Sequence, residues 1–419
     1  MADNQKDELR ESNDENPLQD MGETFDSFPK FIYAFVCKPI FNFVKQAFTS
    51  KSSANKMLIA GVREDSLEKI SESLAKGADI NCKANDGHFN FPPALHFARN
   101  FETLYFLVEN GADVNVTSSF MNTYLHLFTD KEEVLYLIAR GANVNARNYQ
   151  DDTPLHRQTD PIVIEKLIAA GADVNARNHL GNTPLHVQTN PEVIEKLIAA
   201  GADVNARNHL GDTPLHMRKS PVEKIRILLA AGADVNSRNL AEQTPLHIIT
   251  YNGKSVVENV EIMRALIAAG ANVDACDDIG CTPLFYVTKA DYQKELIKAG
   301  AKIDAENING NTAFQNYLFI LILQDNLETL LNAGTDPNHR NNSLRTSLHS
   351  LLEELGTMAY TDVIPVQAVK TLLAYGAKPY IKDSNGESCF DINQRHIQRS
   401  EHDAAAAEIL DKEKLLRIS

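Results

Sequence analysis

The side chains best suited to catalysis or metal binding in this chain are its 13 histidines and five cysteines. Four of the histidines close the same tetrapeptide, Thr-Pro-Leu-His, and they stand at His156, His186, His216 and His247. A group needed for one reaction is needed once, whereas a group needed by a structural unit recurs with that unit. Buried polar groups in proteins are nearly always hydrogen-bonded. We therefore expect structural, hydrogen-bonded imidazoles and no catalytic residue.

The five cysteines are an odd number with no recurring pair spacing, which is typical of a reducing, intracellular setting: Cys37, Cys82, Cys276, Cys281 and Cys389. Cys276 and Cys281 are close in sequence, but no second Cys or His pair accompanies them at the spacing of zinc ligands. The chain also lacks a glycine-rich phosphate loop and the HExxH, GxSxG and kinase motifs. The sequence thus predicts no metal site, no cofactor and no enzymatic activity.

The composition narrows the class of partner. Lys and Arg number 41 against 56 Asp and Glu, a formal net charge of −15, whereas binding to nucleic acid needs a basic excess or a basic stripe. The hydrophobic content of 43% is ordinary for a globular chain. No apolar stretch is long enough to span a bilayer, and no secretory signal is recognisable. We expect a monomeric protein of the cytoplasm with no nucleic-acid partner; secretion into a host cell is left open.

Internal repetition is the strongest pattern in the chain. The 18 residues IEKLIAAGADVNARNHLG occur twice without change, over 164–181 and 194–211, which sets a period of 30 residues. The Gly-Ala-Asp/Asn element recurs at Gly77, Gly111, Gly141, Gly171, Gly201, Gly232, Gly270 and Gly300, with weaker copies at Gly334 and Gly376. Thr-Pro-Leu-His precedes four of these elements, at Thr153, Thr183, Thr213 and Thr244.

The two elements in phase resemble the ankyrin repeat, whose known period is about 33 residues. The resemblance covers about residues 54–395, in which we count ten units including two degenerate ends. It implies an all-α repeat fold: an ankyrin-type solenoid of helix-turn-helix units joined by extended loops or short β-hairpins. It also implies a scaffold that binds other proteins.

The residues of one unit account for this fold locally. Thr183 can cap a short helix whose first position is Pro184, where the missing N–H costs nothing. Asn190-Pro191 repeats this signal for a second helix. Gly201 ends that helix, because the residue after the last turn must often take a left-handed conformation, which glycine adopts at little cost. Leu185 is predicted to face inward, and the second helix has an apolar stripe of Val193, Ile194, Leu197 and Ile198.

Several units depart from the family spacing. From Thr to Gly they span 19 residues, about three fewer than usual, so we expect a shortened first helix. Asp160-Pro161 and Ser220-Pro221 should open their second helices as Asn190-Pro191 does. Two units instead carry insertions, after Thr244 and after Thr346, which we expect to project as loops.

We divide the chain into a disordered acidic leader over 1–30, an apolar amphipathic segment over 31–52, the repeat array over 53–395 and a C-terminal capping helix over 396–419. The leader holds nine acidic and three basic residues. Within 31–48, one helical face would carry Ile40, Phe41, Val44 and Phe48. This segment either packs on the first helix pair as an extra cap or binds a membrane surface or a partner.

Partner binding is expected at the loop tips, since a stacked array loses little ordering entropy on association. Apolar and Arg side chains are typical of interface anchors. The alternative is that the tip side chains pack on neighbouring tips. The expected partner is a protein of unknown identity; a membrane-recruited adaptor using 31–48 and an effector-like protein of an intracellular microbe are the alternatives. The predicted contact residues are Tyr149, Arg177, His179, Leu180, Arg207, His209, Leu210, Leu240, Ile279 and Ile308.

Overall fold

The computed structural model describes residues 38–84, 92–127, 130–218, 220–250, 256–287, 289–316, 327–355 and 364–397. The leader, residues 31–37, the tail from 398 onward and the insertions at 251–255 and 356–363 lie outside this description. The described residues form helices and, apart from isolated bridges such as Glu306 with Thr312, no β-structure. The expected all-α repeat solenoid is thereby confirmed. The chain separates into two compact units, residues 1–149 and 150–419.

The first unit opens on a long helix. α3 runs without a break over Lys38–Arg63 and packs against α4, Leu67–Ala75. α3 therefore continues from the amphipathic segment into the predicted first helix pair; the side chains of 38–50 lie outside the description. The unit then contains η2 (Ala94–Phe97), α5 (Phe101–Glu109), α6 (Tyr124–Leu127) and α7 (Lys131–Ala139).

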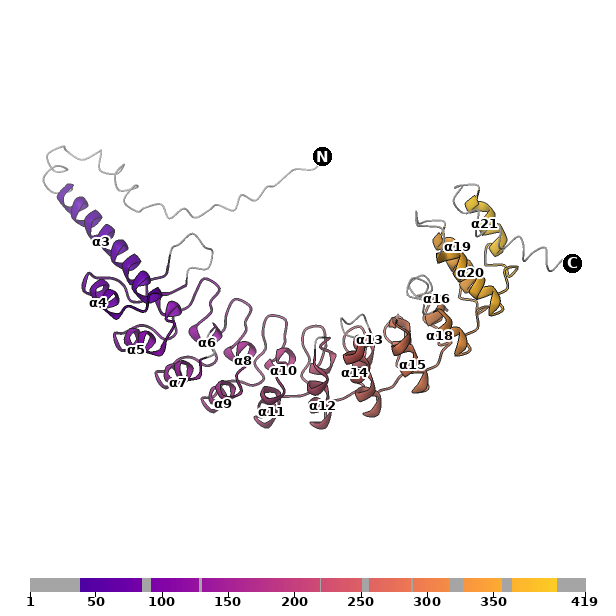
Figure 1. Ribbon diagram of the computed structural model, residues 1–419, viewed down its shortest axis with the longest axis horizontal. Coiled ribbons are helices and arrows are strands. Elements are labelled where there is room, and N and C mark those ends of the chain that lie inside the picture. Colours follow the sequence, from indigo (N-terminus) through magenta and orange to yellow (C-terminus); the bar gives the residue numbers. More distant parts are fainter. Residues whose placement is uncertain are drawn as a thin grey trace. The chain divides into compact units, whose positions relative to one another are not determined.

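In the second unit, short helices of three to six residues mostly alternate with longer ones, and Figure 1 shows α8 and α10 in one row and α9 and α11 in another. The helices in order are α8 (Pro154–Arg157), α9 (Pro161–Ala169), α10 (Pro184–Val187), α11 (Pro191–Ala199), η3 (Pro214–His216), α12 (Val222–Ala230), α13 (Pro245–Thr250), α14 (Val256–Ala268), η4 (Pro283–Tyr286), α15 (Ala290–Lys298), α16 (Ala313–Asn316), α18 (Leu327–Asn332), α19 (Ser347–Leu355), α20 (Ile364–Ala374) and α21 (Cys389–Ile397).

The predicted start and stop signals are confirmed in the unit that begins at Thr183. Thr183 and His186 form a capping box around α10, with Pro184 in the first turn. The side chain of Asn190 accepts a hydrogen bond from the N–H of Glu192 and caps α11. Gly201 then takes a left-handed φ of 89°. The core side chains Leu185, Val193, Ile194 and Leu197 are fully buried.

The shortened first helix leaves carbonyl groups that need donors from elsewhere. A helix of only four residues has no intrahelical partners for its last C=O groups. The buried amide of Gln188 in the next repeat supplies them, since its Nε2 donates to the carbonyl oxygens of Leu155 at 2.9 Å and Gln158 at 2.8 Å. The short helix α8 is thus closed by a side chain of the next repeat.

In the unit that lacks this glutamine, Lys224 donates to the last carbonyl groups of a short helix. The residue that corresponds to Gln188 in the next unit is the exposed Arg218, while Lys224 occupies the buried position of Val193, eight residues before the glycine. Its Nζ donates to the carbonyl oxygens of His186 at 2.9 Å and Gln188 at 2.8 Å. Burial lowers the pKa of this ammonium group to about 7.

The predicted role of Ser220-Pro221 is wrong. α12 begins one residue later, at Val222, with Pro221 as its N-cap and no side-chain cap. The Ser220 hydroxyl is buried without a hydrogen-bond partner among the described residues. The cause is one extra residue between Thr213 and Gly232. Because the second helix keeps its length of nine residues, Ser220 and Pro221 both precede its first residue. Asp160, in contrast, caps α9 as predicted.

Candidate protein-binding surface

The loop tips of the second unit are tight turns closed by the side-chain oxygen of an Asn or Asp. In the tip over 178–182, the N–H of Asn178 donates to the carbonyl of Asn182 at 2.9 Å, and the N–H of Gly181 donates to that of Asn178 at 2.8 Å. The Oδ1 atom of Asn178 accepts from the N–H groups of Leu180 and Asn182, both at 3.0 Å. Leu180 therefore sits at the apex of a turn that its own hydrogen bonds hold rigid.

Backbone hydrogen bonds join successive tips into one row along the second unit. The N–H of His209 donates to the carbonyl of Leu180 at 3.1 Å, and the N–H of Leu240 donates to that of Leu210 at 3.0 Å. The same bond links Gln150 with His179, Ala241 with Asp278, Ile279 with Ile308, Asn309 with Asn342, and Ser343 with Ser384. We call this continuous row of hydrogen-bonded tips, from Gln150 to Ser384, the ledge. A partner would meet it as a preorganised surface.

The ledge has two registers, one for residues that accept the bond and one for residues that donate it. Leu180, Leu210 and Ile279 are acceptors, whereas Leu240 and Ile308 are donors. The apolar residues are therefore divided between these two registers. They form two directly bonded pairs, Leu210 with Leu240 and Ile279 with Ile308, and beyond Ile308 both registers become polar.

The apolar tip side chains are open to solvent. Their exposed fractions are 60% for Leu180, 66% for Leu210, 76% for Leu240, 45% for Ile279 and 64% for Ile308. His179 and His209 are exposed as well. Contiguous exposed apolar side chains of this kind commonly mark interaction sites.

Tyr149 lies at a tip of the first unit, where its side chain is 76% exposed. Its N–H donates to the carbonyl of Phe120 at 2.9 Å. Phe120 and its neighbour Met121 are themselves about half exposed, and neither is among the predicted contact residues. The signal was present, because Phe120 precedes Thr123 by three residues just as Leu180 precedes Thr183.

The arginines below the tips have a structural task that the sequence did not reveal. Nη1 of Arg177 donates to the carbonyl of Arg207 at 2.7 Å, and Arg207 bonds in the same way to Arg238. Arg238 continues the series to the carbonyl of Cys276 at 2.7 Å. The three guanidinium groups remain exposed, so they brace adjacent repeats and also place positive charge beside the apolar tips.

The repeated histidines hold the tips to the short helices. Nδ1 of His186 accepts from the N–H of Thr183 at 3.1 Å, and Nε2 donates to the carbonyl of Asp212 in the next repeat at 3.0 Å. Burial lowers the pKa of His186 to about 4 and also lowers the pKa values of His216 and His247. These imidazoles are neutral structural groups, as predicted.

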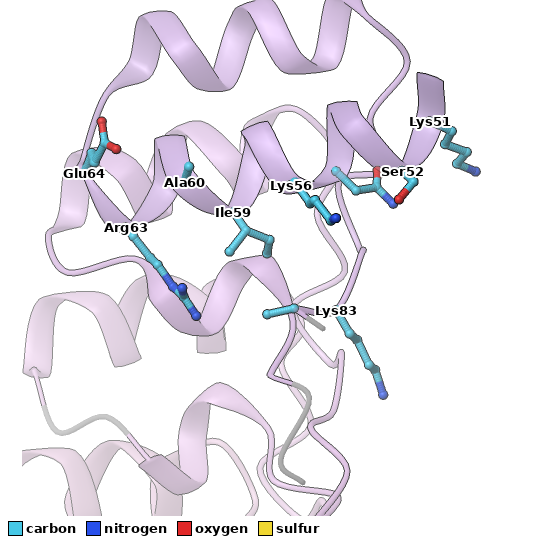
Figure 2. Close-up of a pocket in the computed structure, with 10 residues that line it drawn as sticks. Lys51, Ser52, Lys56, Ile59, Ala60, Arg63, Glu64 and Lys83 are labelled. Atoms are coloured by element: carbon cyan, nitrogen blue, oxygen red, sulfur yellow. The ribbon is translucent and has the colours of Figure 1, made fainter. Parts of the chain in front are cut away.

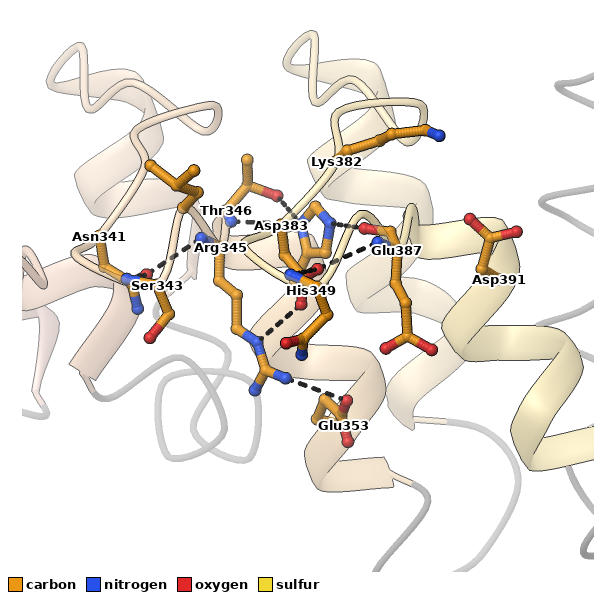
Figure 3. Close-up of polar contacts among 12 residues, drawn as sticks. Asn341, Ser343, Arg345, Thr346, His349, Glu353, Lys382, Asp383, Glu387 and Asp391 are labelled. Carbon is orange, nitrogen blue, oxygen red and sulfur yellow. Dashed lines mark hydrogen bonds and ion pairs between the residues drawn. The ribbon is translucent and has the colours of Figure 1, made fainter.

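Side-chain hydrogen bonds below the tips also link adjacent repeats. The Nδ2 atom of Asn208 donates to Oδ1 of Asn182 at 2.9 Å. In the last described repeats the direction reverses, because Nε of Arg345 donates to Oδ2 of Asp383 at 3.3 Å (Figure 3). Asp383 also accepts from the N–H of Asn385, at 2.8 Å. Burial favours a higher pKa for Asp383, but these hydrogen bonds outweigh it and lower the pKa.

Metal-binding side chains do not gather in the described part of the chain. No three His, Cys, Asp or Glu side chains there come close enough to hold a metal ion. Burial raises the pKa of the Cys281 thiol to about 11 and that of Cys389 to about 12, which makes both poor nucleophiles. Within the same ranges, no helix has the length and apolar character needed to cross a bilayer.

Comparison with known proteins agrees with the repeat geometry. The family model described as ankyrin repeats (3 copies) matches residues 157–239 and 217–307. A similar solved structure is the ankyrin repeat domain of Bcl-3, described as a unique member of the IkappaB protein family. It is 28% identical, covers 48% of this chain and 93% of its own, and has a TM-score of 0.40. No curated protein matches the chain. Ankyrin repeats generally mediate protein–protein interactions, and residues 157–307 of this chain match the model of that family.

Proposed function

We propose that the chain is a non-enzymatic scaffold that binds a protein partner through the tips of its second unit. The observation that carries the proposal is the exposure of two pairs of apolar residues whose backbones are hydrogen-bonded to each other, Leu210 with Leu240 and Ile279 with Ile308. Exposed leucine and isoleucine at these positions contribute nothing to the core. Because the backbone is already ordered, little conformational entropy is lost when a partner binds.

The charge beside the tips indicates the chemistry of the partner. Arg177, Arg207 and Arg238 are exposed below the apolar side chains, although the whole chain is acidic. A partner with an apolar centre and an acidic rim would match this arrangement, and rim charges mainly speed association. His179 and His209 extend the proposed contact with amphipathic side chains, and Tyr149 is the exposed residue at a tip of the first unit.

The experiment that tests this proposal replaces Leu180, Leu210 and Leu240 together with Asp. We expect affinity capture from lysate, read by mass spectrometry, to lose the partner that the unmodified chain recovers, because three desolvated anchors become charged. The matched control is Ile162→Asp, since Ile162 is 45% exposed in the same unit but lies on α9 away from the tips. Equal recovery by the triple variant, with helicity unchanged, would refute the tip assignment.

Two alternatives from the sequence carry less support. Membrane recruitment through 31–48 depends on side chains outside the described residues. An effector-like role in a host cell specifies the source of the partner and leaves the proposed contact surface the same.

A further inference from the structure

A groove with a basic lining lies in the first unit. Its volume is about 870 Å³, and residues 51–63 of α3 with Glu64 form one wall, while Lys83 and Ala84 form part of the other. Figure 2 shows Lys56, Ile59 and Arg63 along one side of α3, with Lys83 on the neighbouring segment. The floor is apolar, because Ile59 and Ala84 are buried.

The charges around this groove are unbalanced. Four cationic side chains line it, Lys51, Lys56, Arg63 and Lys83, against the single carboxylate of Glu64. Glu64 forms an ion pair with Lys69 outside the lining, and Lys51 lies 4.0 Å from the carboxylate of Asp79.

Two of these cations lack partners, and a third is held in place. Lys56 and Lys83 form no ion pair or hydrogen bond with the described residues. The guanidinium carbon of Arg63 sits 4.3 Å from the ring centroid of Phe97, a cation–π contact that fixes its position. The groove therefore holds a cluster of positive charges, although the net charge of the chain is −15.

We propose that this groove binds the acidic segment of the same chain over residues 1–30. That segment holds nine acidic residues and three basic ones, with Leu9, Leu18, Met21 and Phe25 interspersed among them. Its charge complements the lining, and its apolar residues suit the floor. The segment is joined to α3 through residues 31–37, so the effective concentration for binding is set by a short tether and reaches the millimolar range.

The geometry allows this contact within one molecule. α3 begins at Lys38, and a helix rises about 1.5 Å per residue, so Lys51 lies roughly 20 Å along the axis from that start. An extended chain covers up to about 3.3–3.6 Å per residue, so the stretch from Asp26 to Lys38 spans roughly 40 Å. Asp26 and the acidic residues before it can therefore reach the groove.

Zero-length cross-linking of the full chain with a carbodiimide tests this contact in one molecule. We expect amide links from carboxylates of 1–30 to Lys56 and Lys83, with a yield independent of protein concentration and strongly reduced in 0.5 M NaCl, because salt screens exposed charges. Links spread evenly over all exposed lysines, or links that form only between molecules, would overturn the proposal.

A binding experiment supplies a second readout that does not depend on lysine chemistry. The probe is a fluorescent peptide of residues 1–30, and the receptor is the full chain with its nine leader acids changed to amides, so that its own leader no longer competes. We expect Lys56→Glu with Lys83→Glu to weaken binding at least tenfold. The matched control, Lys166→Glu with Lys294→Glu, changes two exposed lysines of the second unit and should alter binding less than twofold. Equal binding by the two variants, or no binding at low salt, would contradict the proposal.

Discussion

The guanidinium group of Arg345 donates a hydrogen bond to the carboxylate of Asp383. At the corresponding positions of preceding repeats, the pair consists of two amides or of one amide and one carboxylate. In preceding repeats the amide of the later repeat donates back to the earlier one, as Asn341 does to Asn311 at 2.8 Å. Between Arg345 and Asp383 the donor and acceptor have exchanged sides, and Glu353 accepts a second bond from the same guanidinium at 3.3 Å. The segment that leads into α21 is thus joined to the preceding repeat by a hydrogen bond whose donor and acceptor have exchanged places.

This reversal predicts a specific pattern of rescue. Arg345→Asn should destabilise the attachment of α21 by about 1–3 kcal/mol, because Asp383 is buried and loses a charged donor. Asp383→Asn should act similarly. The double variant recreates the amide pair of Asn182 and Asn208, so it should be more stable than either single variant. Hydrogen exchange of the amides in 389–392 measures this; additive losses would contradict the reversed hydrogen bond.

Lys224 predicts a stability that rises with pH. Its pKa is about 7 in the folded chain and about 10.5 in the unfolded chain, so the unfolded state binds more protons throughout that window. The free energy of unfolding should therefore increase between pH 7 and 10.5, by up to about 1.4 kcal/mol per pH unit. Thermal melting at several pH values measures the slope.

The control for Lys224 is present in the neighbouring repeat. Lys224→Val should flatten the pH dependence but leave the carbonyls of His186 and Gln188 without donors. Adding Arg218→Gln recreates the arrangement around Gln188 and Val193, so the double variant should regain stability while the flat profile is retained. An unchanged slope in Lys224→Val would show that Lys224 is not the titrating group.

The buried histidines predict a loss of stability in acid. The folded chain holds the pKa of His186 near 4 against an ordinary value of 6.5, so the unfolded state binds more protons between those values. Stability should fall as pH drops through this window, by about 1.4 kcal/mol per pH unit for each such histidine. Unfolding by urea at pH 4.5, 5.5 and 6.5 would measure it.

The chain itself indicates a substitution that removes this dependence. Gln315 occupies the histidine position in its repeat, where Oε1 accepts from the N–H of Thr312 at 3.1 Å and Nε2 donates to the carbonyl of Arg345 at 3.1 Å. His186→Gln should therefore cost less stability than His186→Ala and should weaken the acid sensitivity. Equal losses from the two substitutions would argue against the hydrogen-bonded role.

Gly181 should tolerate alanine less well than Gly201, although both have a positive φ. A Cβ atom at Gly181 would lie 2.8 Å from the backbone nitrogen of His209, whereas none is crowded at Gly201. We expect Gly201→Ala to cost about 1–2 kcal/mol from the left-handed backbone alone, and Gly181→Ala to cost more because adjacent tips must separate. Thermal melting of the two variants compares them directly.

The parts of the fold that could be predicted from the sequence depend on neighbours in the chain. Thr183, Pro184 and Asn190 act as caps through contacts within three residues, and the spacing of Leu185 and Val193 identifies the core. The parts that could not be predicted depend on contacts between repeats. Gln188, Lys224 and the bracing by Arg207 each satisfy a carbonyl about 30 or more residues away, and no local pattern identifies that acceptor.

The same distinction applies to the candidate surface. The exposure of Leu180 and Leu210 follows from their place at a turn, which the sequence indicates. The pairing of Leu210 with Leu240 required the hydrogen bonds between tips, since Leu240 occupies the other register.

The most direct measurement of the proposed binding surface is site-specific photo-cross-linking. A photoreactive phenylalanine derivative would replace Leu210 at the tip or, as a control, Ile162 on α9 of the same unit. Our account predicts that irradiation in lysate joins a protein partner to the chain from position 210 and leaves position 162 without that product. The same partner captured equally from position 162, or no partner captured from position 210, would contradict binding through the tips.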